Sequence, residues 1–253
     1  MEKTLRVATW NIGSLYSDYS RNLAYIQTLL SHQQADILCM QEVPKQEALL
    51  QDICRWGGFS HRVFHTTSIS HVCQGTDMGI AVFSRFPMGA PEILKLTKPA
   101  VAVSYKGRPE VWHDKYFLAV CCDLGSQQAL VVTGHGFPFH RYDLENPEND
   151  HIIRPSFREL DAWFSCLPAR FGMPVTCAAA DFNMTDPMPF LEIGSKQYRD
   201  LFCGEVTRPF GRKTDCILVR DGTCVAEKIN ITPPEENGEE WMDHHFILAA
   251  LQI

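Results

Sequence analysis

The chain has 253 residues, of which 45% are hydrophobic and 21% charged, and its 30 acidic and 23 basic residues give a formal net charge of -7. This composition is typical of a globular protein with a sizeable core. The acidic balance argues against a surface that holds nucleic acid by backbone charge alone. No apolar run is long enough to span a bilayer, so no membrane span is expected.

The sequence begins MEKTLRVATWN, which contains no apolar stretch as long as a signal-peptide core. We therefore expect a cytoplasmic protein with reduced thiols, and the ten cysteines form no C-x-x-C pair that would indicate a structural zinc site. Many of them lie in apolar runs, where a free thiol fills core space: Cys39, Cys121, Cys122, Cys166, Cys177 and Cys216.

The first part of the chain alternates between strand and helix patterns. LRVATW at 5–10 alternates apolar and polar residues, and DILCM at 36–40 is a short apolar run typical of a buried strand. Apolar residues at helical spacing predict a helix over 21–34, and a second helix over 46–56 is stopped by two glycines. This order is typical of βαβ units.

The remaining chain predicts mostly short strands, over 60–66, 79–84, 101–105, 116–123, 129–135, 214–219 and 246–251. Short links between consecutive strands favour antiparallel pairing. A helix is expected over 152–167 and a charged surface loop over 233–240. The simplest architecture is α/β (α+β), with two packed mixed sheets, helices on their outer faces and a single domain over 1–253.

The stretch VTCAAADFN at 175–183 is a buried strand that ends in a carboxylate and an amide. Because side chains alternate along an extended chain, Asp181 and Asn183 should emerge on one side and Phe182 on the other. The alternative is an Asx-type turn at an ordinary strand end.

Polar groups occur next to other predicted strands as well. Each one alone is compatible with a turn former, a helix cap or a loop histidine. Together they predict a functional site at one edge of the sheets, formed by Asn11, Glu42, His135, Asp181, Asn183, Asp215, Asp243 and His244.

These side chains suit metal-assisted phosphate chemistry. The oxygen atoms of Glu42, Asp181, Asn183 and Asn11 are hard ligands of the kind that Mg²⁺ or Mn²⁺ prefers. Histidines can donate to phosphate oxygens or act as a general base, and Asp215 is the natural orienting partner for His244. No Gly-rich phosphate loop is present in the sequence.

Short motifs in matching order resemble the endonuclease/exonuclease/phosphatase (DNase I-like) superfamily. They are TWN at 9–11, QE at 41–42, ADFN at 180–183, TDCILV at 214–219 and MDHHF at 242–246, with GIAVFSRFP at 79–87 similar to a structural strand of that family. The resemblance covers essentially the whole chain. It implies a four-layer α/β sandwich and metal-dependent cleavage of phosphate esters.

The resemblance also implies roles for particular residues. Glu42 would hold the metal, with Asn11 beside it and Asp243 nearby. Asp181 would orient or activate the attacking water, and Asn183 would position the phosphate.

The remaining roles fall to histidines. His244, held by Asp215, would contact the scissile phosphate or take the proton. His135 would match the histidine that follows the central strand, and His140 is a rival for that role.

Some positions depart from the pattern. Ala180 stands where glycine is usual, Met242 stands where serine is usual, and Phe246 occupies a proline position. Gly13 stands where DNA-repair members often carry an acidic residue, and Val43 after QE leans away from the abasic-site nucleases. These changes remove no catalytic group.

Two segments bear on the substrate. The loop HGFPFHRYD at 135–143 could stack a ring and touch a phosphate through Arg141, or its phenylalanines could pack on the sheet edge. Arg208, Arg212 and Lys213 form a basic cluster that is either a phosphate-binding rim, with Arg212 as the substrate contact, or a solvated loop.

Three functions are compatible with these residues. The first is a monomeric, Mg²⁺- or Mn²⁺-dependent phosphoesterase that hydrolyses a diester or monoester of a small molecule or nucleic-acid end by water attack. The second is a DNA-repair endonuclease of the abasic-site type, which should bind duplex DNA in a salt-sensitive way. The third is a catalytically silent binding protein, for which neither metal titration nor Glu42→Ala would show an effect.

Overall fold

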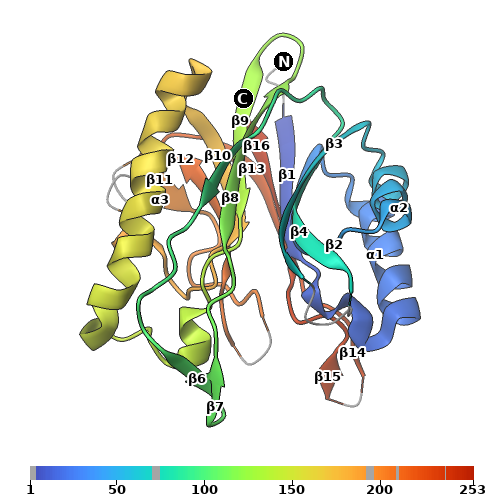
Figure 1. The fold of residues 1–253 in the computed structure, drawn as a ribbon. Coiled ribbons are helices and arrows are strands. Elements are labelled where there is room, and N and C mark those ends of the chain that lie inside the picture. The colour runs from blue at the N-terminus through green and yellow to red at the C-terminus, as the bar shows by residue number, and fades with distance from the viewer. Residues whose placement is uncertain (1–3, 70–74, 192–196, 209–210, 237) are drawn as a thin grey trace.

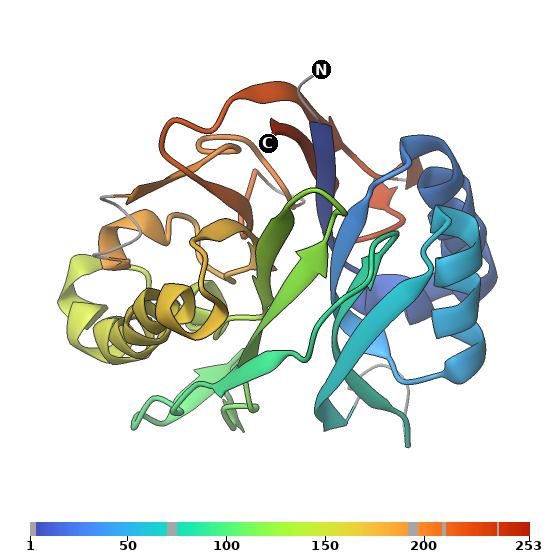
Figure 2. The same cartoon turned by 90° about the horizontal axis from the view of Figure 1, so that it is seen from above.

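The computed structural model describes residues 4–69, 75–191, 197–208, 211–236 and 238–253. Two six-stranded sheets pack face to face with helices on their outer sides (Figure 1). Helices α1 (Tyr19–Gln33) and α2 (Glu47–Gly57) cover the first sheet, and α3 (Asp150–Phe171) covers the second. The view from above shows these four layers side by side (Figure 2), which confirms the predicted α/β sandwich.

The first sheet has the strand order β13-β16-β1-β2-β4-β3. Strands β1 and β2 run parallel, because α1 makes the crossover between them, and the other pairs are antiparallel. The strands are β1 (Thr4–Asn11), β2 (Ile37–Pro44), β3 (His61–Ile69), β4 (Asp77–Ser84), β13 (Val225–Ile231) and β16 (Phe246–Gln252).

The second sheet has the order β11-β12-β10-β9-β8-β5. Its parallel pair is β9 and β10, joined by α3, and the other pairs are again antiparallel. The strands are β5 (Glu92–Lys95), β8 (Tyr116–Asp123), β9 (Gln128–Gly134), β10 (Val175–Asp181), β11 (Tyr198–Asp200) and β12 (Asp215–Arg220).

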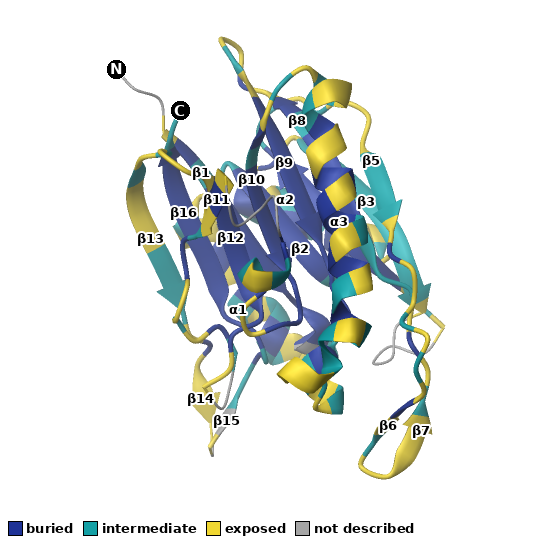
Figure 3. Ribbon diagram, turned by 90° about the vertical axis from the view of Figure 1, so that its left-hand side faces the viewer, coloured by how far each residue is buried: buried dark blue, intermediate teal, exposed yellow. Residues whose placement is uncertain are grey.

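Apolar side chains fill the three spaces between the four layers. Val7 and Val131 lie between the two sheets, Ile26 and Met40 lie between the first sheet and its helices, and Leu160 lies between the second sheet and α3. Helix α3 alternates a buried inner stripe with an exposed outer stripe (Figure 3). This amphipathic pattern explains why it packs on one face of the sheet.

Short hairpins and 3-10 helices lie outside the two main sheets. Strands β6 (Val103–Tyr105) with β7 (Arg108–Glu110), and β14 (Glu235–Glu236) with β15 (Glu239–Glu240), form two hairpins that project from the same end of the molecule (Figure 1). The short 3-10 helices are η1 (Gly13–Asp18), η2 (Phe139–Tyr142), η3 (Pro147–Asn149) and η4 (Met188–Phe190).

The predicted helices and the central strands are confirmed, with ends that differ by a few residues. The 233–240 segment was predicted to be a loop but contains the β14–β15 hairpin. The prediction that Cys166 fills the core was wrong, because Cys166 lies on the exposed face of α3, and Cys121 is only partly buried. No helix within the described ranges is long and apolar enough to cross a membrane.

Candidate active site

The site lies where the two sheets meet at the ends of their parallel strands. Asn11 is the last residue of β1 and Asp181 is the last residue of β10. The Asn11 Nδ2 atom donates a hydrogen bond of 2.9 Å to Asp181 Oδ2. Both side chains are buried, with Asp181 fully excluded from solvent, so this bond fixes one sheet against the other.

A buried polar network supports the site and explains why the motifs carry polar neighbours. Gln41 Nε2 donates to the hydroxyls of Thr9 and Thr133, at 3.0 Å each, and so links β1, β2 and β9. The indole of Trp10 donates from Nε1 to the backbone carbonyl of His244 at 3.2 Å. The residues next to Asn11 and Glu42 therefore hold the backbone that presents the site.

Glu42 lies at an irregularity of β2, where the pairing with β4 shifts register between Met40 and Val43. Its φ of 54° is in the left-handed region, which is costly for a residue other than glycine. A β-bulge re-aims a side chain in this way. The Glu42 Oε1 atom lies 3.6 Å from His135 Nε2.

His135 follows β9 and bridges the two carboxylates of the site. Its Nε2 atom lies 3.5 Å from Asp181 Oδ2, in addition to its approach to Glu42. His140 instead directs its ring to the carbonyl of Asn183 at 3.1 Å. Of the two rival histidines, His135 is the one placed among the predicted metal and catalytic residues.

Asp181, His244 and Asp215 form a buried chain of side chains. His244 Nδ1 donates to Asp215 Oδ2 at 2.9 Å, and its Nε2 lies 3.8 Å from Asp181 Oδ2. The hydroxyl of Thr214 donates to Asp215 Oδ2 at 3.2 Å, while Thr207 Oγ1 accepts the backbone N–H groups of Thr214 and Asp215. The imidazole is therefore held in a fixed orientation.

The pKa values of two side chains in this buried group, Asp181 and His244, lie above their ordinary values. Burial and the nearby charge of Asp215 raise the pKa of Asp181 to about 6. Burial alone would lower the pKa of His244, but the negative charges of Asp215, Asp243 and Asp181 raise it to about 9. Near pH 7.5 the site therefore holds an ionised carboxylate next to a protonated imidazole.

Asn183 reaches the site in a different way from the predicted one. Strand β10 ends at Asp181, and Asn183 has a left-handed φ of 52°. Its backbone N–H donates to Asp181 Oδ1 at 2.7 Å and its Nδ2 donates to the carbonyl of Gly136 at 3.2 Å. The Asx-type turn that the sequence left as an alternative is present here, and it holds Asn183 next to Asp181.

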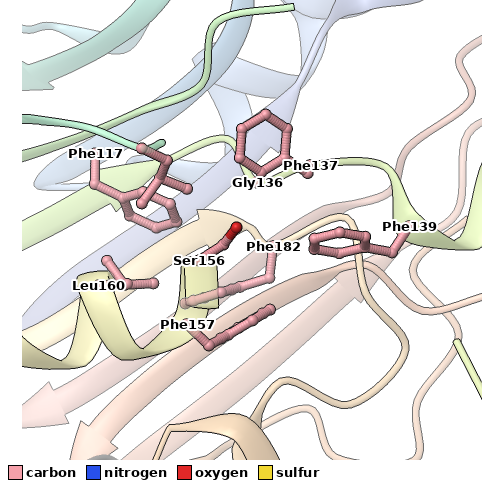
Figure 4. Close-up of a pocket in the computed structure, with 9 residues that line it drawn as sticks. Phe117, Gly136, Phe137, Phe139, Ser156, Phe157, Leu160 and Phe182 are labelled. Carbon is pink, nitrogen blue, oxygen red and sulfur yellow. The ribbon is translucent and has the colours of Figure 1, made fainter. Parts of the chain in front are cut away.

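Phe182 points away from this polar edge, as the strand alternation predicted. It lines a small apolar void with Phe117, Phe139 and Phe157, and Ser156 supplies the one side-chain oxygen there (Figure 4). The void measures about 10 Å³, the lower limit for a single water molecule. It is a packing space behind the site, lined by the ring of Phe182, which directly follows Asp181.

Asp243 is paired with an arginine. Its Oδ2 atom accepts from Arg208 Nη2 at 3.0 Å, and its backbone carbonyl accepts from Arg208 Nε at 3.3 Å. Arg208 Nη1 also lies 3.3 Å from His140 Nε2. The sequence placed Arg208 only in a basic cluster, whereas the structure ties it to the residue that precedes His244.

The contacts of His140 define its charge state. A guanidinium can only donate, so His140 Nε2 accepts from Arg208 and its Nδ1–H donates to the Asn183 carbonyl. This is the neutral tautomer. Burial lowers the pKa of His140 to about 4, and the positive charge of Arg208 adds to the effect.

We expect His140 to make the protein less stable in mild acid. The pKa of His140 in the folded protein lies below the ordinary histidine value of about 6.5, so its contribution is complete above about pH 6.5 and is lost as the pH falls towards 4. The loss should be roughly 2 kcal/mol. Urea unfolding at pH 7 and pH 4.5 should show a smaller pH dependence in His140→Asn, and an equal dependence would contradict this.

Lys115 belongs to the site but has no sequence motif. Its Nζ lies 3.1 Å from His135 Nε2, and although burial lowers its pKa to about 8, the charges of Glu42 and Asp181 oppose that change. Lys115 directly precedes β8, whose first residues pair with the end of β9. The antiparallel register of these strands was the signal that could have revealed it.

The predicted substrate contacts lie at different places. Arg141 pairs with Glu110 at 2.7 Å and covers the Tyr105 ring at 4.1 Å, so it binds the β6–β7 hairpin. Arg212 is exposed on a loop near Thr214. Lys213 is not a solvated side chain, as the solvated-loop alternative required, because it is buried and pairs with Asp200 at 2.6 Å.

The phenylalanines of the 135–143 loop pack inwards. Phe137 and Phe139 are buried and contact the Trp112 ring, with ring centroids 5.4 and 5.8 Å apart. Of the two alternatives for this loop, ligand stacking and internal packing, these phenylalanines follow the second.

Two groups of side chains could hold a cation. Asp181, Asp215 and His244 have ligand atoms within 4.8 Å of one another. The second group is Glu42 with Asn11, where a Cβ at Gly13 would lie 2.0 Å from Glu42 Oε2 and 3.3 Å from Asn11 Oδ1. The missing side chain at Gly13 thus makes room for the Glu42 carboxylate to approach Asn11 Oδ1, and two hard oxygen donors side by side fit a divalent ion such as Mg²⁺.

Solved structures share this architecture. An endonuclease/exonuclease/phosphatase from Bacteroides vulgatus has a TM-score of 0.69 at 15% identity, with 100% of both chains covered. One from Beutenbergia cavernae scores 0.67 at 17% identity, covering 99% of this chain and 72% of that one. The human Nocturnin catalytic domain with bound sulfate anion scores 0.66 at 16% identity, covering 99% and 96%. At these identities, the likeness concerns the fold.

The sequence itself gives the class. The model of the Endonuclease/Exonuclease/phosphatase family matches residues 8–234, which is most of the chain. The chain belongs to this family, as the motifs predicted. No curated protein sequence gives a match.

Proposed function

We propose that the chain is a divalent-metal-dependent phosphoesterase that cleaves its substrate by attack of water. The observation that supports this best is the buried Asp181 carboxylate, held by Asn11 and lying 3.8 Å from the Nε2 of an imidazole that Asp215 orients. A carboxylate with a pKa near 6 beside a cation with a pKa near 9 suits proton transfer at neutral pH.

Each residue has a proposed task. Asp181 orients the water and takes its proton, while the protonated His244 donates to a phosphate oxygen and Asp215 keeps the ring in place. Asn183 positions the phosphate, and its backbone is fixed by the Asx turn. Lys115 adds a hydrogen-bond donor and positive charge at the same edge, next to the His135 ring.

Glu42 and Asn11 would hold Mg²⁺ or Mn²⁺, which when bound acts as a Lewis acid on the phosphoryl group. We favour this position over the Asp181–Asp215–His244 group because the raised pKa of His244 keeps its imidazole protonated at neutral pH, and only a neutral imidazole binds a metal. Asp243 remains a proposed neighbour of the metal, although its Oδ2 is engaged by Arg208.

Gly13→Ala tests the position of the metal. The new methyl group must displace the Glu42 carboxylate, whose end is flexible, so we expect a stability cost of about 1 kcal/mol. The affinity for Mn²⁺, measured by calorimetry, should fall about 10-fold.

The matched control for that variant is Gly89→Ala. Its added Cβ would meet nothing closer than Cys121 O at 3.9 Å, so neither affinity nor stability should change much. Equal Mn²⁺ affinity in the Gly13 and Gly89 variants would count against Glu42 as the ligand.

The direct test is an activity screen with Mg²⁺ or Mn²⁺ over a panel of phosphodiesters and monoesters. Wild type is compared with Asp181→Asn and His244→Ala, and both variants should lose the activity. Absence of cleavage across the panel would refute the proposal. The bound sulfate in Nocturnin is consistent with phosphate binding on this fold.

The other two hypotheses have less support. A net charge of -7 and a glycine at position 13 argue against a DNA-repair endonuclease, and failure to incise an abasic-site duplex would dispose of it. The silent binding protein would have no need for the buried, mutually oriented Asp181, His244 and Asp215.

A further inference from the structure

A polar groove of about 300 Å³ lies beside the candidate site. Three loops form it, those that follow β9 and β10 and the one that precedes β12. The loops contribute His140 and Glu145, Thr185, and Arg212 with Thr214, respectively. Two of these loops also carry His135 and Asn183, and the third leads directly into Asp215 at the start of β12, so the groove and the site are built on the same segments.

Direct contacts connect the groove to the catalytic residues. Thr214 donates its hydroxyl to Asp215 Oδ2 at 3.2 Å, and His140 donates to the carbonyl of Asn183 at 3.1 Å. A phosphate held next to Asn183 would therefore have its alcohol portion directed at the groove.

Glu145 is a fixed hydrogen-bond acceptor in the wall of the groove. The Thr185 hydroxyl donates to its Oε2 at 2.8 Å and the Thr185 N–H donates to its Oε1 at 3.2 Å. A carboxylate has more acceptor sites than these two bonds use. It can therefore accept further hydrogen bonds from ligand hydroxyl groups without changing its orientation.

The charges of the groove favour an uncharged ligand. Arg212 and Lys213 oppose Asp143 and Glu145, but the charge of Lys213 is already neutralised by Asp200 at 2.6 Å. The remaining negative charge of Asp143 and Glu145 disfavours a ligand that carries a phosphate or carboxylate group in the groove. Among the described residues that line it there is no phenyl, indole or aliphatic side chain to bind a base or an acyl chain.

We infer that the groove binds the alcohol portion of the substrate, and that this portion is a small, uncharged, polyhydroxylated group, as in a sugar or polyol phosphate. The inference rests on the proposed phosphoesterase function. The Arg212 guanidinium can donate to ligand hydroxyls, while the threonine hydroxyl oxygens and the fixed Glu145 carboxylate can accept from them, and such mixed donors and acceptors recognise adjacent hydroxyls.

The test compares two monoesters, glucose 6-phosphate and phenyl phosphate. Wild type should show a kcat/KM at least about 10-fold higher for the sugar ester, and Glu145→Gln should lower that ratio about 10-fold, mainly through KM. Glu148→Gln, in the neighbouring turn η3 and outside the groove, should keep the wild-type ratio. A wild-type ratio near one, or a ratio unchanged in Glu145→Gln, would overturn the inference.

A binding measurement tests the groove independently of the proposed catalytic function. Calorimetry with glucose 6-phosphate on the Asp181→Asn protein should show binding that Glu145→Gln weakens, whether or not the ester is cleaved. Cleavage of phenyl phosphate without sugar preference would refute the groove alone, and Glu145-dependent binding without cleavage would refute the function alone. If Glu145→Gln does not fold, Thr185→Val, which removes the hydroxyl bond to Glu145 Oε2 and keeps the backbone one, should weaken binding in the same direction, and unchanged binding would refute the groove.

Discussion

Asp181→Asn is expected to lower kcat by about 1000-fold while leaving the fold intact, because a buried general base contributes on the order of 100- to 10,000-fold. The amide oxygen can still accept from the Asn183 N–H, but the amide cannot take a proton, and its NH2 group replaces the oxygen that accepts from Asn11. The measurement is the steady-state rate of the best ester in the panel, at saturating Mg²⁺.

The unfolding temperature of Asp181→Asn should change much less than its kcat. Burial and Asp215 raise the pKa of Asp181, so the folded protein is destabilised by this charge above about pH 6. A neutral amide avoids that cost but gives up the hydrogen bond from Asn11, so the two effects oppose each other and thermal unfolding at pH 8 should occur near the wild-type temperature. A loss of activity with a large fall in unfolding temperature would instead indicate a structural role.

The control for Asp181→Asn is Asp186→Asn. Asp186 follows the same strand by five residues but is exposed on the surface of the loop. Its replacement should change neither kcat nor the unfolding temperature. Similar kinetic effects in both variants would show that the loop, rather than the buried carboxylate, controls the activity.

Much of the site could be predicted because its residues end or begin buried strands. Asn11, His135, Asp181 and Asp215 each adjoin an apolar run, and parallel strands bring such ends to one edge. Lys115 could not be found in the same way, because a lysine before a strand is ordinarily exposed. Only the register of β8 against β9 places it next to His135.

The positions that sequence reasoning placed less well are those with unusual backbone. The predicted strand over 36–40 stops before Glu42, and the predicted strand over 175–183 runs two residues beyond Asp181. Both Glu42 and Asn183 have a left-handed φ that no periodicity encodes. Local rules fail at these two residues because the surrounding structure imposes the conformation there.

Edge strands were the main omission in the fold. Strands β5, β11 and β13 lie at the edges of the two sheets. Their exposed side chains are largely polar, so apolar periodicity is weak. The central strands were predicted because those such as β10 are apolar on both faces.

Glu42→Gln is expected to weaken divalent-metal binding by at least about 100-fold, the upper end of what loss of an outer partner costs. The neutral amide removes the one full charge that we assign to the ion, and the geometry at the bulge is retained. Mn²⁺ calorimetry measures the affinity directly, and activity at high Mg²⁺ should recover in part. Glu47→Gln, an exposed glutamate paired with Arg62, is the matched control.

The same experiment decides between the two cation positions. If the ion binds at Glu42 and Asn11, Asp215→Asn should leave the affinity for Mn²⁺ nearly unchanged while disturbing the orientation of His244 and lowering kcat. If the ion binds instead at Asp181, Asp215 and His244, Asp215→Asn should abolish binding and Glu42→Gln should not. Because the raised pKa of His244 requires it to lose a proton before it can bind metal, that second outcome would also make the Mn²⁺ affinity rise steeply with pH up to about 9.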